Sequence, residues 1–288
     1  MLSPGSLKDG LYPTMTRADY DAILGRMNYS RLKLLRDSPR TFIESELDPD
    51  PPDKDAYRVG RAFHVATYEP EVFRSNWCVY DGRRAGEEWD RFEENATAEG
   101  REVLNVKEHE LVTAMARAVR SNVDAAPFIG GGKIEATVLW TATTKVDGIA
   151  QQVPFKSRID LLKADGITDL KSTVSARPDD FARQAFKLGY WLQSSAYRQA
   201  VLKVTGKLLP YTIVAVEKRK PFNVSVFSLT QAQLDFGDNE LSALLATLLR
   251  CRATNEWPSY QQGIHELPTP RWAFNEEEDP AALGLEGL

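Results

Sequence analysis

Three charged side chains, Asp160, Asp169 and Lys171, lie on either side of a short polar stretch. Residue types alternate over 153–173, which predicts two antiparallel strands joined by a turn at 163–166. Because strand side chains alternate between the two faces, all three charged groups are expected on one face. A divalent metal ion would neutralise two carboxylates held this close together.

Two registers fit this hairpin. A turn centred on 164–165 places Asp160 opposite Asp169, and a turn centred on 165–166 places Asp160 opposite Lys171. One magnesium ion can then be shared by the two aspartates, since opposed Cβ atoms lie about 4.5–5.5 Å apart. Lys171 could orient a metal-bound water or help to remove its proton. The alternative is an exposed, solvated face, because runs of charge usually mark surfaces.

Three further side chains have a functional and a plain structural interpretation. His64 lies in a helix predicted over 56–73, as either a hydrogen-bonded core residue or a ligand. Glu135 opens a predicted strand and is either an additional metal or water ligand or an edge-strand charge. Arg158 shares the predicted metal face with Asp160; its guanidinium suits a DNA phosphate, and the alternative is a surface ion pair.

Helical spacing indicates two further sets of candidate residues. Gln193 and Tyr197 lie four residues apart and share one face of a helix predicted over 178–204. A tyrosine at this spacing is usually a core residue. A basic stripe follows one face of a helix predicted over 30–42: Lys33, Arg36 and Arg40. The stripe is either a solvated surface or a contact to the DNA backbone.

The composition is that of a soluble globular protein, with 288 residues, 42% hydrophobic and 27% charged. The N-terminal sequence lacks the features of a signal peptide and no long apolar run is present, so a cytoplasmic location is expected. Cys78 and Cys251 are expected to be free thiols, too few for a four-thiolate iron–sulfur cluster. A net charge of −5 argues against coating of nucleic acid by bulk electrostatics, but not against local DNA binding.

The pattern of elements predicts one α/β domain over 1–288, with flexible tails at 1–15 and 275–288. An N-terminal helical region precedes a mixed sheet flanked by helices. Helices are expected over 16–25, 30–42, 56–73, 83–98, 107–123, 178–204 and 231–253. Strands are expected over 135–144, 153–162, 167–173, 211–218 and 223–230.

Several motifs occur in a specific order. GxxxH ends at His64, Asp160 follows, DxK spans 169–171 and QxxxY spans 193–197. This order resembles the RecB-type branch of the PD-(D/E)xK nuclease superfamily. The fuller resemblance is to the exonuclease domain of RecE-type phage and prophage recombination nucleases, and it runs from about residue 10 to 273. One departure is an isoleucine, Ile159, where the superfamily motif has proline.

The resemblance implies a PD-(D/E)xK nuclease core and a magnesium-dependent exonuclease, with manganese as a substitute metal. It implies degradation of the 5′-ended strand of linear double-stranded DNA, which leaves 3′ single-stranded overhangs. A RecT-type single-strand annealing protein would then be the partner. It also implies a homo-oligomeric ring, typically a tetramer.

With the resemblance, the candidate residues take roles. His64 is expected to complete the metal shell of the two aspartates, and Glu135 matches a family acid more loosely. Lys171 is expected to orient the attacking water, while Gln193 and Tyr197 position the phosphate or Lys171. Two alternatives remain open: a RecB-like nuclease acting on single-stranded ends, and a non-catalytic DNA-binding protein on a nuclease scaffold.

Overall fold

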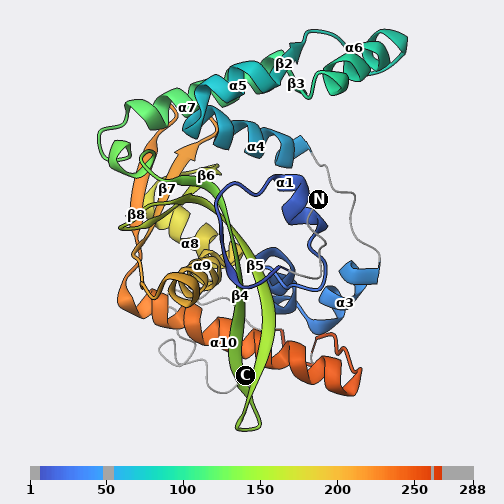
Figure 1. Cartoon of the computed structure of the whole chain (residues 1–288), viewed down its shortest axis with the longest axis vertical. Coiled ribbons are helices and arrows are strands. Elements are labelled where there is room, and N and C mark those ends of the chain that lie inside the picture. The colour runs from blue at the N-terminus through green and yellow to red at the C-terminus, as the bar shows by residue number, and fades with distance from the viewer. Residues whose placement is uncertain (1–6, 48–54, 261–262, 268–288) are drawn as a thin grey trace, which may run out of the picture.

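A six-stranded mixed sheet forms the centre of the computed structural model, which describes residues 7–47, 55–260 and 263–267 (Figure 1). The strand order is β1-β4-β5-β6-β7-β8. Strands β6 and β7 are parallel, and the other neighbouring pairs are antiparallel. The strands are β1 (Gly10–Tyr12), β4 (Lys133–Val146), β5 (Ile149–Leu162), β6 (Ile167–Thr173), β7 (Tyr211–Glu217) and β8 (Val224–Ser228).

Helices cover both faces of this sheet and bury two apolar clusters (Figure 1). On one face, α4 and α7 pack over Leu170 and Val214. On the other face, α9 and α10 pack over Trp140 and Ile213. The longer helices are α4 (Asp55–Tyr68), α6 (Glu87–Ala98), α7 (Val106–Ser121), α8 (Pro178–Leu188), α9 (Tyr190–Thr205) and α10 (Gln231–Thr254). The shorter ones are α1 (Arg17–Ala22), α2 (Tyr29–Leu32), α3 (Pro39–Leu47) and α5 (Pro70–Asn76), with 3₁₀ turns η1 (Lys33–Arg36) and η2 (Ala126–Phe128).

The predicted α/β fold, a mixed sheet flanked by helices after an N-terminal helical region, is confirmed. A second, two-stranded parallel sheet was not predicted; it consists of β2 (Trp77–Tyr80) and β3 (Glu102–Asn105), with α6 between them. In Figure 1 this unit extends away from the central sheet. Within the described ranges, no helix combines the length and the apolar character needed to cross a membrane.

Three of the predicted helices are divided, each for a local reason. The helix predicted over 30–42 begins earlier, with its N-cap at Asn28, and it gives way to the 3₁₀ turn η1 before α3 starts at Pro39. The second ends at Tyr68, and α5 restarts at Pro70, because proline cannot donate the backbone hydrogen bond that would continue a helix. The third is broken at Gly189, whose φ of 72° is left-handed.

The chain termini differ in part from the predicted tails. Within the first tail, Gly10–Tyr12 forms β1 and pairs with β4. Just after it, Thr16 caps α1. Residues 1–6 and 275–288 lie outside the described residues. A long β4–β5 hairpin, closed by Asp147 and Gly148 with positive φ values, was also not predicted. Such Asp-Gly turns match the twist of antiparallel strands.

Candidate active site

The β5–β6 hairpin opens into a fork where the predicted carboxylates lie. Its ladder contains the pairs Leu161↔Thr168 and Leu162↔Ile167, which is the register that opposes Asp160 to Asp169. Beyond these pairs the strands part. The Oδ2 atom of Asp160 accepts a hydrogen bond from the backbone N–H of Leu170 at 2.9 Å. The carboxylate therefore replaces a carbonyl acceptor in the ladder, which fixes its position between the two strands.

Glu135 lies directly across the other side of Asp160. The flanking pairs of the β4–β5 ladder are Ile134↔Leu161 and Ala136↔Ile159. Between them, Glu135 has a φ of 51°, a left-handed conformation that is uncommon for a residue with a side chain. Its carboxylate accepts a 2.5 Å hydrogen bond from Nε of Arg158. A strained backbone thus delivers this third carboxylate to the fork, and such strain is concentrated at functional sites.

The imidazole of His64 reaches the same place from α4. Its Nε2 lies 3.0 Å from the carbonyl oxygen of Leu170. Because a carbonyl only accepts hydrogen bonds, Nε2 carries a proton and donates it. The other nitrogen, Nδ1, lies 3.7 Å from a carboxylate oxygen of Glu135 and 3.7 Å from one of Asp160. This arrangement aims the remaining nitrogen at the two acids, as in many metal-binding histidines.

Gly60, the first residue of the GxxxH motif, has no close-packing role in the structure. A Cβ atom built at this position would meet nothing within 4 Å. The approach of α4 to its neighbours therefore does not require a glycine here. His64 reaches the fork without it.

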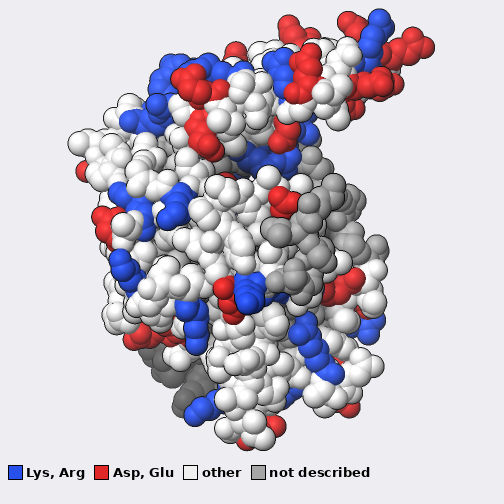
Figure 2. All heavy atoms as spheres, viewed as in Figure 1, with Lys and Arg blue, Asp and Glu red and all other residues white. Residues whose placement is uncertain are grey.

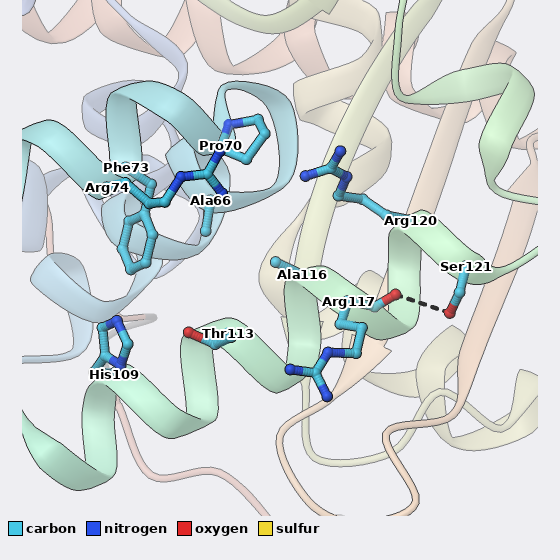
Figure 3. Close-up of a pocket in the computed structure, with 10 residues that line it drawn as sticks. All are labelled: Ala66, Pro70, Phe73, Arg74, His109, Thr113, Ala116, Arg117, Arg120 and Ser121. Atoms are coloured by element: carbon cyan, nitrogen blue, oxygen red, sulfur yellow. Dashed lines mark hydrogen bonds between the residues drawn. The ribbon is translucent and has the colours of Figure 1, made fainter.

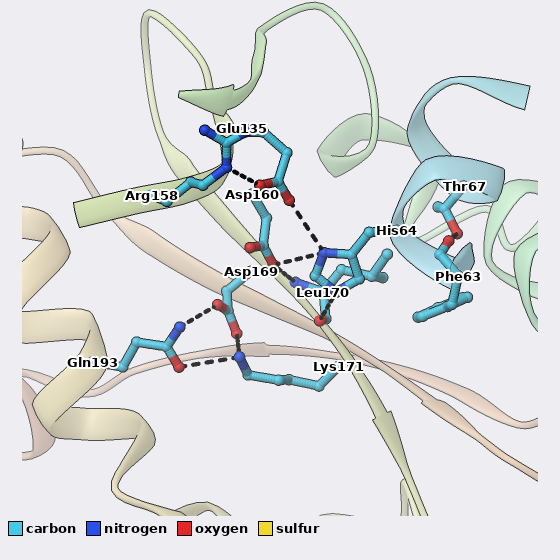
Figure 4. Close-up of polar contacts among 10 residues, drawn as sticks. All are labelled: Phe63, His64, Thr67, Glu135, Arg158, Asp160, Asp169, Leu170, Lys171 and Gln193. Atoms are coloured by element: carbon cyan, nitrogen blue, oxygen red, sulfur yellow. Dashed lines mark hydrogen bonds and ion pairs between the residues drawn. The ribbon is translucent and has the colours of Figure 1, made fainter. Parts of the chain in front are cut away.

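Together His64, Glu135 and Asp160 form a cluster that fits a divalent cation (Figure 4). One ligand atom from each residue lies within 4.8 Å of the other two. Carboxylate oxygens suit hard cations such as magnesium and manganese, and the imidazole adds one nitrogen ligand. The cluster contains three acidic or imidazole groups with few protein donors to balance them, which is the chemistry expected of a metal site.

Asp169 belongs to an adjoining group with Lys171 and Gln193 (Figure 4). Nζ of Lys171 lies 2.7 Å from Oδ2 of Asp169 and donates to Oε1 of Gln193 at 3.0 Å. The amide of Gln193 in turn donates to Oδ1 of Asp169 at 2.9 Å. Asp169 is fully buried, and its Oδ2 is engaged by the ion pair with Lys171. A cation beside Asp160 would have to share that oxygen with Lys171.

The electrostatics of the fork favour displacement of protons by a metal. Burial raises the pKa of Asp160 to about 6, and the charges of Asp169 and Glu135 add to the effect. Burial disfavours the charged imidazole, but the carboxylates of Asp160 and Glu135 raise the pKa of His64 to about 9. Without a cation, a proton on the imidazole therefore balances part of the negative charge.

Lys171 is a permanent cation at this site. Burial acts to lower its pKa, but the charges of Asp169 and Asp160 outweigh it and hold the pKa above the usual value for lysine. The ring of Tyr190 lies 4.8 Å from the ammonium nitrogen and adds a favourable cation–π contact. The sequence argument did not identify Tyr190. It occurs three residues before Gln193 on the same face of α9, and that spacing was the available signal.

The remaining candidates have other surroundings. Tyr197 is buried on α9, one turn after Gln193, and burial together with the charge of Asp160 raises its pKa. Arg158 is mostly buried; besides Glu135, its guanidinium donates to the carbonyl oxygen of Met15 at 3.1 Å. A phosphate contact by Arg158 stays a prediction, as does the sharing of one ion by Asp160 and Asp169.

The three residues of the basic stripe have different environments in the structure. Arg36 pairs with Glu240 and donates to backbone carbonyls at the end of α8, and Arg40 pairs with Glu44. Lys33 forms no ion pair with the described residues and lies 5.8 Å from the ring centre of Tyr29. Burial and the nearby charge of Lys171 lower the pKa of Lys33. Lys33 is thus near enough to the fork to feel the charge of Lys171.

The mixed sheet, the carboxylates at its fork and the DxK lysine define a PD-(D/E)xK-type nuclease fold. The chain belongs to the family described as "PDDEXK-like domain of unknown function (DUF3799)", which matches residues 28–266. This confirms the superfamily that the motifs indicated. The RecE-type assignment within it stays a prediction.

Comparison with solved structures supports the same fold. A presumed exonuclease from Eubacterium rectale aligns with a TM-score of 0.59 at 16% identity, covering 89% of this chain and 96% of that one. An alkaline exonuclease from Laribacter hongkongensis aligns with a TM-score of 0.24 at 16% identity, covering 69% and 96%. The second score is too low to indicate a shared fold. No curated protein matches the chain.

Proposed function

We propose that this protein is a divalent-metal-dependent exodeoxyribonuclease. The observation that carries the proposal is the meeting of two groups at one fork: His64, Glu135 and Asp160 on one side, and Asp169 with Lys171 on the other. Membership of the PDDEXK-like family supports the same chemistry. The reaction would be hydrolysis of a phosphodiester bond.

The cation would be held by Nδ1 of His64 and the carboxylates of Asp160 and Glu135, with Oδ2 of Asp169, which pairs with Lys171, beside them. When bound, magnesium or manganese would polarise the scissile phosphate and stabilise negative charge on the leaving oxygen. The hydrogen bond from Nε2 of His64 to the carbonyl of Leu170 fixes the ring so that Nδ1 stays directed at the site. The N–H of Leu170 does the same for Asp160.

Lys171 would act as a fixed positive charge. Its raised pKa keeps it protonated at neutral pH, so it donates hydrogen bonds and does not accept a proton from water. It would orient the attacking water and stabilise charge that develops on the phosphate. Gln193 holds the ammonium and Asp169 in place through its two amide atoms. Gln193 is therefore a positioning residue.

The direction and the substrate rest on the RecE-type resemblance. On that basis, the enzyme degrades the 5′-ended strand of linear double-stranded DNA and leaves 3′ single-stranded overhangs. A RecT-type annealing protein would bind those overhangs, and the enzyme would act as a homo-oligomeric ring. Lys33 and Arg158 are the candidate phosphate contacts near the fork.

The test is digestion of a linear duplex in two labelled forms, one labelled at its 5′ ends and one at its 3′ ends. Each form is digested with magnesium and, as a control, with EDTA. The proposal predicts early release of 5′ label, retention of long 3′-labelled strands, and no reaction in EDTA or on closed circular duplex. Faster digestion of a single strand than of the duplex would favour a RecB-like nuclease. Binding without hydrolysis, in wild type and Lys171→Ala alike, would favour a non-catalytic protein.

A further inference from the structure

A cavity with a volume of about 580 Å³ lies between α5 and α7, beside the end of α4 (Figure 3). Ala66, on its wall, follows His64 by two residues, so the two side chains leave α4 on roughly opposite sides. The cavity is therefore separated from the fork by α4 itself. Its lining is not used by the proposed reaction.

The rim of this cavity is basic. Arg74 comes from the end of α5, and Arg117 and Arg120 come from the last turns of α7 (Figure 3). Arg74 pairs with Glu71 of its own helix. For Arg117 and Arg120, both exposed, the described residues provide no acidic partner. Acidic side chains instead gather on α6, at the far end of the same layer (Figures 1 and 2).

The floor of the cavity is apolar, and one polar group on its wall has no hydrogen-bond partner among the described residues. Ala66, Phe73 and Ala116 are buried and contribute to the floor, and the ring of Phe73 stacks on His109 with centroids 5.6 Å apart. The hydroxyl of Thr113 lines the wall, is shielded from solvent and has no hydrogen-bond partner among the described residues. A ligand that fills this cavity must supply both an apolar group and a hydrogen-bonding group.

We propose that this cavity binds an acidic peptide segment of a partner protein, with one apolar side chain inserted between α5 and α7. Carboxylates of the segment would pair with Arg117 and Arg120, whose planar guanidinium groups suit carboxylates. Its backbone would satisfy the hydroxyl of Thr113. A nucleic-acid backbone matches the charge of the rim but offers no large apolar group for the floor, so the peptide fits more of the lining.

The test uses fluorescence anisotropy in EDTA with a labelled pool of octapeptides. Each peptide carries four Asp or Glu residues beside a Leu, Ile, Met or Phe, and a second pool has Ser in place of the apolar residue. Wild type is expected to bind the first pool at least about tenfold more tightly than the second, because the apolar floor is then filled. Equal binding of both pools, or binding of neither, would overturn the proposal.

Charge reversal locates the site. Arg117→Glu with Arg120→Glu should weaken binding of the first pool by about tenfold or more, since each lost pair becomes a repulsion. Arg40→Glu with Arg183→Glu changes the net charge equally at exposed, distant positions and should leave binding unchanged. Circular dichroism checks folding, and Thr113→Val offers a milder variant that should also weaken binding.

Titration with oligonucleotides tests the alternative that the cavity binds nucleic acid. A labelled 20-nucleotide single strand and its duplex are titrated against the same variants. If Arg117→Glu with Arg120→Glu weakens DNA binding while the wild type ignores both peptide pools, the cavity is a nucleic-acid site and the peptide assignment is wrong. Digestion of linear duplex by this variant should remain at the wild-type rate, so failure of the nuclease proposal is separately visible.

Discussion

The side chain of Asp160 takes the place of a backbone acceptor for Leu170, at 2.9 Å, where β5 and β6 part. The backbone of Leu170 is used twice, because its carbonyl oxygen also accepts a hydrogen bond from His64. One residue of the strand thus positions both an acid and an imidazole. The proposed metal site depends on the backbone N–H and C=O groups of Leu170 and not on side-chain packing alone.

Asp160→Asn separates charge from position. The amide oxygen of asparagine can still accept the hydrogen bond from Leu170, so folding should be retained. Removing a buried negative charge should leave DNA binding equal or tighter, while hydrolysis falls by about 100-fold or more because metal binding is weakened. Digestion of labelled duplex and anisotropy with the same duplex measure the two effects. Loss of folding would instead assign Asp160 a structural role.

Gln193 is predicted to act on the rate of hydrolysis and not on substrate binding. Gln193→Ala removes one acceptor from Lys171 and one donor from Asp169, so kcat should fall by about 10- to 100-fold with little change in KM. Gln199→Ala is the matched control, because Gln199 lies on the same helix and bonds Asp238 instead. An equal loss in both variants would indicate a general effect on α9.

The main strands of the sheet and most residues at the fork follow from local patterns in the sequence. The pattern left two β5–β6 registers open, and the structure has the one that opposes Asp160 to Asp169. The helix breaks at Pro70 and Gly189 could also have been predicted, since proline and glycine commonly end helices. What local pattern does not show is the long-range geometry. The left-handed backbone of Glu135 and the hydrogen bond of His64 to Leu170 arise only when separate elements meet.

The grouping of the acids also depends on that geometry. Sequence reasoning paired Asp160 with Asp169 because they oppose one another in the hairpin. In the structure, Asp160 is grouped with Glu135 and His64, whereas Asp169 is held by Lys171 and Gln193. The strands part at this point, so strand alternation alone did not determine which side chains meet.

His64 makes the stability of the metal-free protein depend on pH. Its pKa is raised from 6.5 to about 9 in the folded state, so the folded protein holds this proton more tightly than the unfolded chain. This contribution is fully present below pH 6.5 and is lost as pH rises through about 9. In EDTA, the Tm should therefore decline across this window, and His64→Gln should flatten the decline.

Added metal should reverse the trend. Because manganese must displace the proton of His64, its stabilising effect should be larger at pH 9 than at pH 6.5. The pKa of Asp160 is raised from 3.8 to about 6, so Asp160 also makes the folded protein less stable as pH rises, but between about pH 4 and 6. Above pH 7 its titration is nearly complete. A Tm in EDTA that rises from pH 6.5 to 9 would contradict the assigned interactions of His64.

Lys33 is predicted to contact the DNA backbone. Lys33→Ala should raise KM several-fold with little change in kcat. The slope of log binding constant against log salt concentration should become shallower by about 1, the value for one lost phosphate contact. Arg40→Ala is the control, since Arg40 belongs to the same stripe but pairs with Glu44. If both variants show the same salt dependence as wild type, the stripe is a solvated surface.

The most direct measurement is the anomalous scattering of manganese in crystals of the wild-type protein. The account predicts one peak or a close pair of peaks at the fork, with Nδ1 of His64 and carboxylate oxygens of Glu135 and Asp160 about 2.0–2.3 Å away. The same crystals of Asp160→Asn should show the peak weakened or lost. No peak at the fork in the wild type at saturating manganese, or a strong peak at a distant site alone, would contradict the central claim.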